Sequence, residues 1–358
     1  MQRNSQQSIL YTAYPLLPVS DSSCGGAEQI LFTLEHEMFS RGHATTVAAC
    51  DTSRVSGELF ATGREAEKDD LFESRDAEQT LRVLRLTESR DFSIVHDHSG
   101  SFFKHADRVE APVLVTLHLP RSLYSEAMFR AIPHNVYFNC VSDFQAASFS
   151  DLPRMRGVVQ NGIAVERFPI ARKKDDYLLW LGRICPEKAP HLAIEAAKRA
   201  GMKLVLAGQV YPFSYHRMYF DREVKPWLEA PNPHVRFVEL PSFAEKVDLL
   251  QRAKALLVTS LVAETCSLVS LEAGACGTPV IAFRNGALSE VVSHGHSGFT
   301  VRTLDEMIAA ISDVGEIWPD ECRHRIETRF SSKAMADGYE QLYQQVIDET
   351  RESTLLAA

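Results

Sequence analysis

Short apolar runs alternate along the chain with longer segments in which apolar residues recur every three or four positions. The short runs are typical of buried strands, and the longer segments are typical of amphipathic helices. In the first half, a helical pattern at 28–42 lies between strand-like runs at 9–15 and 44–50. Strands that alternate with helices predict a parallel sheet covered on both faces. Further strands are expected at 92–96, 112–118, 136–142 and 157–162.

The same alternation begins again after a charged segment, ARKKDD, at 171–176. This segment suits a linker, so we expect an N-terminal domain over 1–170 and a C-terminal domain over 171–330. A final helix is expected over 331–349, or to about 350, with Ser331 or Ser332 as its N-cap. The pattern therefore predicts an α/β protein with two Rossmann-like, doubly wound domains. Strands of the second domain are expected at DYLLWLG, KLVLAG, VRFVEL, KALLVTS and PVIAF.

The charge and composition exclude several classes of protein. The 38 basic and 47 acidic side chains give a net charge of -9, which argues against nucleic-acid binding. No apolar run has the length of a membrane span, and the first residues, MQRNSQQSIL, lack the apolar core of a signal peptide. Seven cysteines without paired spacing suit a reducing compartment. We therefore expect a cytoplasmic protein without a transmembrane segment, for which peripheral membrane contact stays open.

Polar residues follow many of the expected strands. In parallel sheets of this kind, ligands bind beyond the carboxyl ends of the strands. The recurrence of such residues in both halves predicts a ligand cleft between two facing domains. His96 and His98 have the side chains of zinc ligands, but no further ligand has zinc-site spacing, so we expect no metal site. The strand-end residues are Gly25, Gly26, His96, Asp97, His98, His118, Ser142, Asn161, Gly182, Arg183, Gly208, Glu264 and Gly286.

Two carboxylates, Glu264 and Glu272, lie in a segment with the composition of a buried one, AETCSLVSLEAGACGTPVIAF at 263–283. Buried carboxylates are costly unless they are paired. The pattern predicts a short loop after a strand and then a helix, with Ser267 as N-cap and Gly277 at its end. Free amides at a helix start attract anions, and a carboxylate can accept hydrogen bonds from two vicinal hydroxyls. A nucleotide sugar, with phosphates between two polyols, would use all of these groups.

The segment GRICPEK at 182–188 supplies two cations just after a strand. Arg183 binds phosphate as a fork and Lys188 as a point charge, so that together they could offset a diphosphate without a metal ion. Taken singly, each would more often be a solvated surface cation. Their place beside the two glutamates favours a phosphate-binding role.

Together these segments resemble glycosyltransferase family 4, whose members are retaining enzymes of the GT-B fold. The resemblance covers roughly 9–345 and includes CGGAEQ, VHDHSG, VTLH, VVQNGIAVERF, GRICPEK, ETCSLVSLE, EAGACGTPVIAF, NGALSEVV and GHSGF. It implies transfer of a sugar from a nucleotide-diphosphate sugar, with UDP favoured by family frequency alone. The implied acceptor is a sugar, a lipid-linked molecule or a small molecule. The resemblance also implies that no cofactor is needed and that the final helix crosses back to the N-terminal domain.

The resemblance further implies residue roles. Arg183 and Lys188 match residues that bind the donor diphosphate, Glu272 matches the glutamate that binds the ribose, and Glu264 matches the one near the donor sugar. His118 matches a histidine over the reaction centre. The implied catalytic residues are therefore His118, Arg183, Lys188 and Glu264. The other donor-binding candidates are Gly25, Gly26, Gly208, Cys266, Ser267, Leu268, Val269 and Glu272, and the acceptor-cleft candidates are His96, Asp97, His98, Ser142 and Asn161.

The sequence departs from the family pattern in three places, which leave other functions open. Cys266 and Ser267 replace an aromatic residue and a glycine, Ala189 replaces the glycine after the motif lysine, and Ala287 replaces the second glycine of a pair. The β-carbon of Ser267 lies where the sugar would approach, and bears on sugar specificity more than on the reaction. A nucleotide-sugar epimerase, a sugar phosphorylase and a non-catalytic nucleotide-sugar-binding protein are the alternatives. The intact cations and glutamates favour a transferase.

Overall fold

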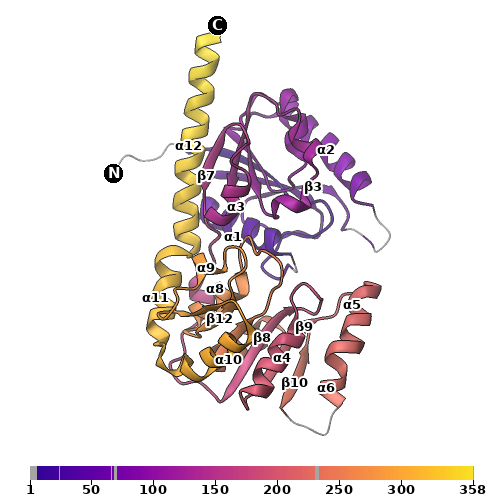
Figure 1. Ribbon diagram of the computed structural model, residues 1–358. Helices are drawn as coiled ribbons and strands as arrows, with labels where there is room; N and C mark the ends of the chain where they lie inside the picture. Colours follow the sequence, from indigo (N-terminus) through magenta and orange to yellow (C-terminus); the bar gives the residue numbers. More distant parts are fainter. Residues whose placement is uncertain (1–5, 24, 66, 68–70, 230–233, 358) are drawn as a thin grey trace. The chain divides into compact units, whose positions relative to one another are not determined.

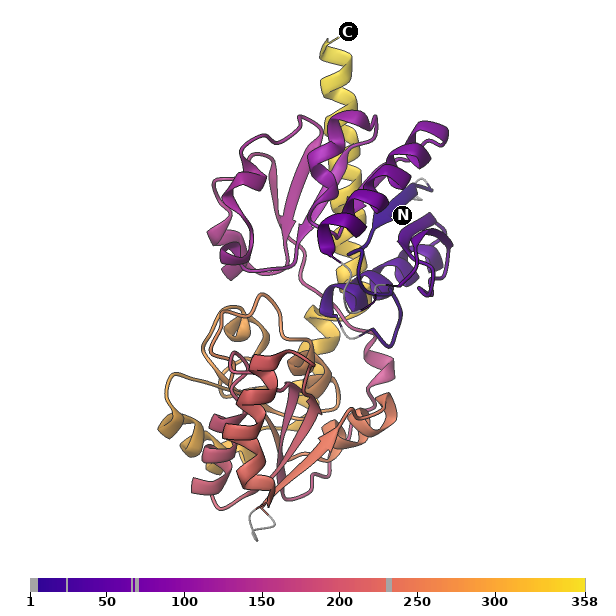
Figure 2. The same ribbon diagram turned by 90° about the vertical axis from the view of Figure 1, so that its right-hand side faces the viewer.

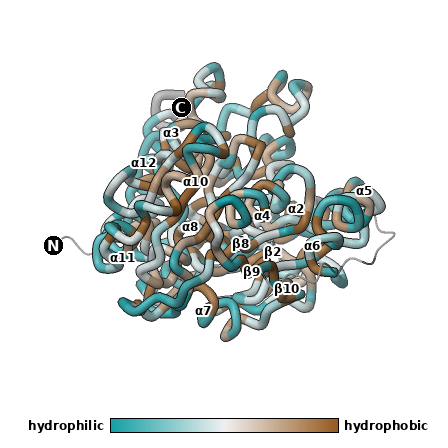
Figure 3. The backbone as a smooth tube through the Cα atoms, turned by 60° about the horizontal axis from the view of Figure 1, so that its bottom comes forward, coloured by the Kyte–Doolittle hydropathy of each residue, from teal (hydrophilic) through white to brown (hydrophobic). Residues whose placement is uncertain are grey.

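The computed structural model describes residues 6–23, 25–65, 67, 71–229 and 234–357. The chain forms two compact units, each with its own parallel sheet (Figure 1, Figure 2). The first unit comprises Met1–Gly162 and Ser332–Ala358, and the second comprises Ile163–Ser331. Apolar residues gather on the strands of the sheets, as the brown segments of Figure 3 show. This confirms the expected α/β class with two Rossmann-like units.

The first unit contains a seven-stranded sheet in the order β3-β2-β1-β4-β5-β6-β7. All neighbouring strands in it are parallel, and the central strands are almost completely buried. The strands are β1 (Ser8–Thr12), β2 (Ala44–Cys50), β3 (Glu58–Gly63), β4 (Ile94–Asp97), β5 (Val113–Leu117), β6 (Val136–Cys140) and β7 (Met155–Val158). The helices are α1 (Gly26–Ser40), α2 (Phe72–Ser89), η1 (Phe102–Arg108), η2 (Arg121–Leu123), η3 (Glu126–Phe129), α3 (Asp143–Ser148) and α12 (Ser332–Ala357).

The second unit contains a six-stranded parallel sheet in the order β10-β9-β8-β11-β12-β13. Its strands are β8 (Tyr177–Arg183), β9 (Lys203–Gln209), β10 (Val235–Glu239), β11 (Ala255–Val258), β12 (Val280–Phe283) and β13 (Gly298–Val301). Its helices are η4 (Val165–Arg167), α4 (Pro190–Arg199), α5 (Ser214–Tyr219), η5 (Phe220–Val224), α6 (Lys225–Glu229), α7 (Phe243–Arg252), α8 (Leu268–Ala275), α9 (Leu288–Val291), α10 (Leu304–Asp313), η6 (Val314–Glu316) and α11 (Pro319–Arg329).

The final helix, α12, belongs to the first unit although it follows the second unit in sequence. Its Tyr339 hydroxyl lies 3.0 Å from Thr116 Oγ1 on β5, and its Tyr343 hydroxyl lies 2.7 Å from His96 Nδ1 on β4. In the same part of the helix, Glu340 forms an ion pair with Arg41 and is hydrogen-bonded to His43 Nε2 at 2.9 Å. The helix was expected over 331–349 and extends further, to Ala357. The buried hydroxyls of Tyr339 and Tyr343 attach its N-terminal half to the sheet of the first unit.

The boundary expected between residues 170 and 171 falls instead between Gly162 and Ile163. Ile163 and Phe168 are buried in the core of the second unit, so the segment before the charged run already belongs to that unit. Within the charged run, Lys174 Nζ donates hydrogen bonds to Gln251 O and to Thr278 Oγ1, at 2.9 and 2.7 Å. The run is therefore a surface segment anchored to the second unit, which its charge alone did not reveal. In the described part of the chain, no helix has both the length and the apolar character needed to cross a membrane.

Candidate functional site

The loop after β11 holds Glu264 beside residues 285–287. The Ala287 amide donates a hydrogen bond of 2.7 Å to Glu264 O, and Glu264 and Gly286 form an isolated parallel bridge. Gly286 has a φ of +65°, and a β-carbon there would lie 2.2 Å from Glu264 O. The backbones approach so closely that only glycine fits. The Gly–Ala pair, in which the sequence departs from the family pattern, thus keeps the glycine that the fold requires.

Lys188 is the partner of Glu264. The two side chains form an ion pair in which the Glu264 side chain is 11% exposed. The Lys188 loop is held against the end of β11 by two hydrogen bonds, from Leu261 N to Glu187 O at 2.8 Å and from Thr259 Oγ1 to Lys188 O at 3.0 Å. The backbone thus places this ammonium next to the carboxylate, and the structure brings together two residues that the sequence assigned to one ligand.

Glu272 is paired with a lysine that the sequence analysis missed. Lys246 Nζ on α7 lies 2.6 Å from Glu272 Oε1, and also lies over the rings of Phe168 and Phe243. The other carboxylate oxygen, Glu272 Oε2, is buried and has no hydrogen-bond partner among the described residues. The sequence did contain a sign of this lysine's role, because Lys246 lies on the same helical face as Phe243 and Val247, which belong to the apolar stripe of α7. A lysine within that stripe indicates a buried partner.

The start of α8 lies in the sequence between the two glutamates. Ser267 is its N-cap, as expected, but its hydroxyl is hydrogen-bonded to Ser270 Oγ at 2.8 Å rather than capping a backbone amide. The first helical bonds run from the amides of Ser270 and Leu271 to Ser267 O. The amides of Leu268 and Val269 come before these bonds, at the positive end of the helix dipole. This segment, with Cys266 just before it, can therefore favour an anion.

Arg183 and Gly208 lie at the carboxyl ends of β8 and β9. Arg183 is exposed, and its guanidinium lies over the Tyr211 ring at 5.7 Å. Gly208 pairs with Gly182, and a β-carbon on Gly208 would lie 1.8 Å from Gly182 O. The close approach of the two strands explains this glycine without a ligand. Arg183, by contrast, has an exposed charge at the end of the sheet where ligands bind.

The three histidines of the first unit form a hydrogen-bonded chain. His118 Nε2 lies 2.9 Å from His98 Nδ1, and His98 Nε2 lies 3.3 Å from His96 Nδ1. His96 and His98 are buried, whereas His118 is partly exposed. His96 is also hydrogen-bonded to Tyr343 and Thr116. Of the three, His118 is thus the one that a ligand can reach. The buried His98 is hydrogen-bonded to the His118 ring, and His96 is hydrogen-bonded to His98.

Asp97 and Ser142, which we expected in the acceptor cleft, have structural partners. The buried Asp97 carboxylate accepts hydrogen bonds from Thr12, from Ser99 and from the Gly100 and Phe103 amides. Ser142 is the N-cap of α3 and accepts a hydrogen bond from Gln145 N. These contacts give both side chains a role in fixing loops.

Asn161 and the two glycines at the start of α1 remain candidates for ligand binding. Asn161 is buried, and its Oδ1 has no hydrogen-bond partner among the described residues. Gly25 is the N-cap of α1 and Gly26 is its first residue. A β-carbon on Gly25 would lie 1.8 Å from Glu28 Oε2, so a larger residue there would displace the end of the buried Glu28 side chain. The preceding Cys24 lies outside the described residues.

The buried histidines should make the protein less stable in mild acid. Burial holds the pKa values of His96 and His98 well below their usual range, and lowers the pKa of His118 to about 4. The unfolded chain takes up protons below about pH 6.5, whereas the folded chain keeps these rings neutral. The free energy of unfolding should therefore fall by about 1.4 kcal/mol per pH unit for each of His96 and His98 as the pH falls below 6.5.

Urea unfolding followed by circular dichroism at several pH values between about 5 and 7 tests this prediction. His98→Gln should have a shallower pH dependence than the wild-type protein, because one buried neutral imidazole has been removed. Equal slopes in the two proteins would show that His98 takes up its proton in the folded state as easily as in the unfolded state.

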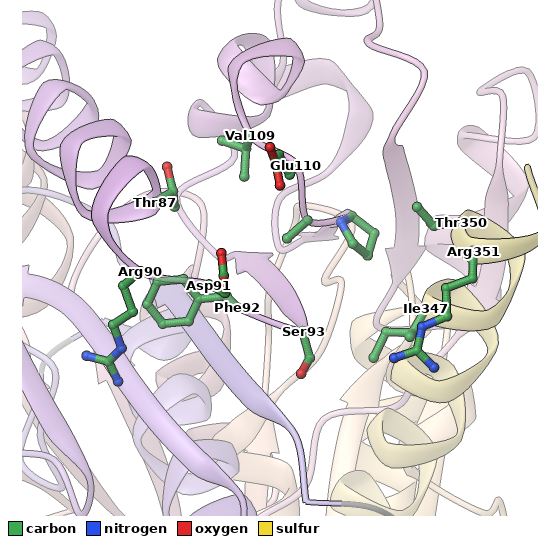
Figure 4. A pocket seen from close by; sticks show the side chains of 12 residues that line it. Thr87, Arg90, Asp91, Phe92, Ser93, Val109, Glu110, Ile347, Thr350 and Arg351 are labelled. Atoms are coloured by element: carbon green, nitrogen blue, oxygen red, sulfur yellow. The ribbon is translucent and has the colours of Figure 1, made fainter. Parts of the chain in front are cut away.

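A pocket of about 600 Å³ opens in the first unit, and none of the candidate site residues lines it (Figure 4). Its lining includes Asp91 and Ser93 just before β4, Pro112 just before β5, and Ile347 and Arg351 on α12. These positions are at the amino ends of the strands. Ligands of doubly wound sheets bind at the carboxyl ends, so this pocket does not form part of the candidate site.

Comparisons with known proteins show what the second unit is similar to. Residues 164–329, nearly the whole second unit, match the family model of glycosyl transferases group 1. An uncharacterised glycosyltransferase of Methanocaldococcus jannaschii is 26% identical over 233 residues, which are 60% of this chain and 62% of that protein. The chain thus spans less than two thirds of this relative and of the next curated relatives that it matches.

Solved structures cover almost the whole chain. The sucrose-phosphate synthase of Thermosynechococcus elongatus has a TM-score of 0.79 at 18% identity, covering 96% of this chain and 100% of its own. Anabaena HepE, solved in complex with UDP and glucose, has a TM-score of 0.72 at 16% identity, covering 95% and 100%. These findings confirm the two Rossmann-like units of a GT-B fold and support the expected glycosyltransferase class. Family 4 and the residue roles stay predictions.

Proposed function

We propose that the protein is a retaining glycosyltransferase of family 4 that moves a sugar from a nucleotide-diphosphate sugar, UDP-linked by preference, to an acceptor. The proposal rests on the second unit, in which two Lys–Glu ion pairs are built around the start of α8. The observation that carries it is the buried Glu272 Oε2, which has no partner among the described residues. A buried acceptor without a donor is costly, and a ligand hydroxyl would satisfy it.

The parts of a nucleotide sugar correspond to the groups of this site. The ribose hydroxyls would donate to Glu272, whose other oxygen is already held by Lys246. The diphosphate would lie at the amides of Leu268 and Val269. Glu264 would contact the donor sugar, as the family resemblance implies. The complex of Anabaena HepE with UDP and glucose supports a donor of this type.

Stabilisation of the negative charge on the leaving group would lower the barrier to sugar transfer. Breaking the bond between sugar and phosphate leaves negative charge on the nucleoside diphosphate and an oxocarbenium-like sugar. Arg183, Lys188 and the helix amides would stabilise this charge more strongly in the transition state than in the bound donor. Two side-chain cations would make a divalent metal unnecessary at the phosphates. Retention of configuration and the contact of His118 with the donor sugar rest on the resemblance to family 4.

Thermal unfolding with a panel of nucleotides tests the donor class. UDP should raise the melting temperature more than GDP or ADP, because a ligand that binds only the folded state stabilises it by mass action. Turnover of the UDP-sugar should then release UDP at a rate that added Mg²⁺ or Mn²⁺ does not change. Binding without turnover of any sugar nucleotide would favour the non-catalytic alternative, turnover that requires inorganic phosphate would favour the phosphorylase, and isomerisation of the sugar would favour the epimerase.

A further inference from the structure

Three potential metal ligands meet in the second unit beside the candidate site. Cys185 and Glu187 lie in the loop that follows β8, and His216 lies on α5. A sulfur, a carboxylate oxygen and a ring nitrogen from these residues all lie within 4.8 Å of one another. Among the described residues, no other group of three or more His, Cys, Asp or Glu side chains meets this condition. Sequence spacing did not predict the cluster, because its histidine comes from a separate element.

His216 gives an independent sign of a ligand. The residue is completely buried, and neither of its ring nitrogens has a hydrogen-bond partner among the described residues. The rings of Tyr211, Phe213 and Tyr215 lie around it, with centroids 6.0, 5.3 and 4.2 Å away. Glu187 Oε2 is likewise buried without a partner. Buried polar atoms of this kind normally indicate a bound water or ion.

We propose that Cys185, Glu187 and His216 bind a transition-metal ion, and that zinc fits them best. Thiolate, imidazole and carboxylate are the three side-chain ligands that zinc takes in proteins, at about 2.0–2.3 Å from the ion. Donor atoms that lie within 4.8 Å of one another can converge on one ion with small side-chain movements. Soft sulfur selects zinc over magnesium and calcium, which prefer all-oxygen sites.

Binding balances both charge and protons. The Cys185 thiol, which is hydrogen-bonded to the Glu187 carboxylate, loses its proton to solvent when its sulfur binds the ion. A thiolate and a carboxylate then neutralise the two positive charges of zinc. The site as a whole is therefore neutral and does not repel the neighbouring Arg183 cation. Three protein donors leave the fourth tetrahedral position to water.

The ion would tie the loop after β8 to α5. The two loop ligands lie between Arg183 and Lys188 in the sequence. A bound ion would therefore restrict the backbone that carries both cations, without itself contacting a substrate. Aromatic residues around His216 would shield its ring from bulk solvent and hold it in place. This inference does not depend on the sugar-transfer proposal, because a metal site can be measured without a substrate.

Metal content is the first test. Protein made without a polyhistidine tag and dialysed against metal-free buffer should retain about one zinc ion per chain by inductively coupled plasma mass spectrometry. His216→Gln and Cys185→Ser should each lose most of it. Cys322→Ser is the matched control, because Cys322 is also a buried free cysteine of this unit but lies outside the cluster. It should keep the wild-type zinc content.

Cobalt gives a readout that a loss of folding cannot imitate. Wild-type protein stripped of metal and loaded with Co²⁺ should show a near-ultraviolet thiolate-to-cobalt band and the strong visible absorption of a tetrahedral site. Glu187→Gln, a mild change in a partly exposed residue, should weaken binding while the protein stays folded. Added zinc should raise the melting temperature of the stripped wild-type protein and leave that of His216→Gln unchanged. Zinc content equal in wild type and His216→Gln, or a cobalt spectrum without the thiolate band, would overturn the proposal.

Discussion

Lys188→Ala should lower the maximal rate of sugar transfer by about ten- to a hundredfold, with a smaller effect on donor affinity. Negative charge grows on the diphosphate as its bond to the sugar breaks, and the Lys188 ammonium would stabilise this charge. A charge-assisted contact of this kind contributes about 1.5–3 kcal/mol, which corresponds to that loss of rate. The measurement is donor turnover, or slow hydrolysis of the donor while the acceptor is unidentified.

The ion pair of Lys188 with Glu264 requires a stability control. Without the ammonium, a largely buried carboxylate is left unpaired, which destabilises the fold. Melting temperatures should therefore be measured, and rates compared where both proteins are folded. Lys254→Ala is the matched variant, because Lys254 belongs to the same unit and also forms an ion pair, with Asp176 at 3.7 Å, but precedes β11 instead of following a strand. A wild-type rate in folded Lys188→Ala would contradict the proposed role.

Arg183 should act on the same phosphates as Lys188. Arg183→Lys should recover only part of the rate lost in Arg183→Ala, because the fork that matches two phosphate oxygens is gone. The combined loss of both cations should be smaller than the product of the two single losses, since coupled groups are not additive. Fully multiplicative losses would show that the two residues act at independent places.

Glu272→Gln should weaken the binding of free UDP by about tenfold or more, since a hydrogen bond to a charged group contributes about 1.5–3 kcal/mol. The amide keeps the size of the carboxylate and an oxygen that can accept from Lys246, so the ion-pair partner stays hydrogen-bonded. What is lost is the charged acceptor for the ribose hydroxyls. Isothermal titration calorimetry with UDP measures the effect directly.

Glu264→Gln is the matched comparison for Glu272→Gln. Both are glutamates paired with a lysine, yet Glu264 would face the sugar and not the nucleoside. Glu264→Gln should therefore change UDP affinity little and depress transfer. A strong loss of UDP affinity in Glu264→Gln, with none in Glu272→Gln, would reverse the two assignments.

The central strands of both sheets could be predicted from the sequence, but two edge strands could not. β3 and β13 are each the last strand of their sheet. Fully buried strands such as β5 consist almost entirely of apolar residues. β3 and β13 keep several partly exposed positions, because one side of an edge strand lacks a neighbour. β10 is also an edge strand with partly exposed positions, yet its apolar run was expected, so an edge position weakens the apolar signal without always hiding the strand.

The sequence by itself determined the local features of the candidate site. It placed a helix start after Ser267, and indicated that Glu264 and Glu272 lie in a segment with the composition of a buried one, where carboxylates need partners. Such features depend on residues that are neighbours in the chain. The apolar pattern that defines them is local, so it can be recognised without knowledge of the fold.

Only the tertiary structure decided which groups meet. Lys246 reaches Glu272 from a separate helix, His216 reaches Cys185 from another, and Tyr343 on the final helix reaches His96 on β4. Each pairing depends on how helices pack on a sheet and on how loops close at strand ends. A polar side chain carries the same letter in the sequence whether it faces water or a buried partner, so the partner appears only when the chain is folded.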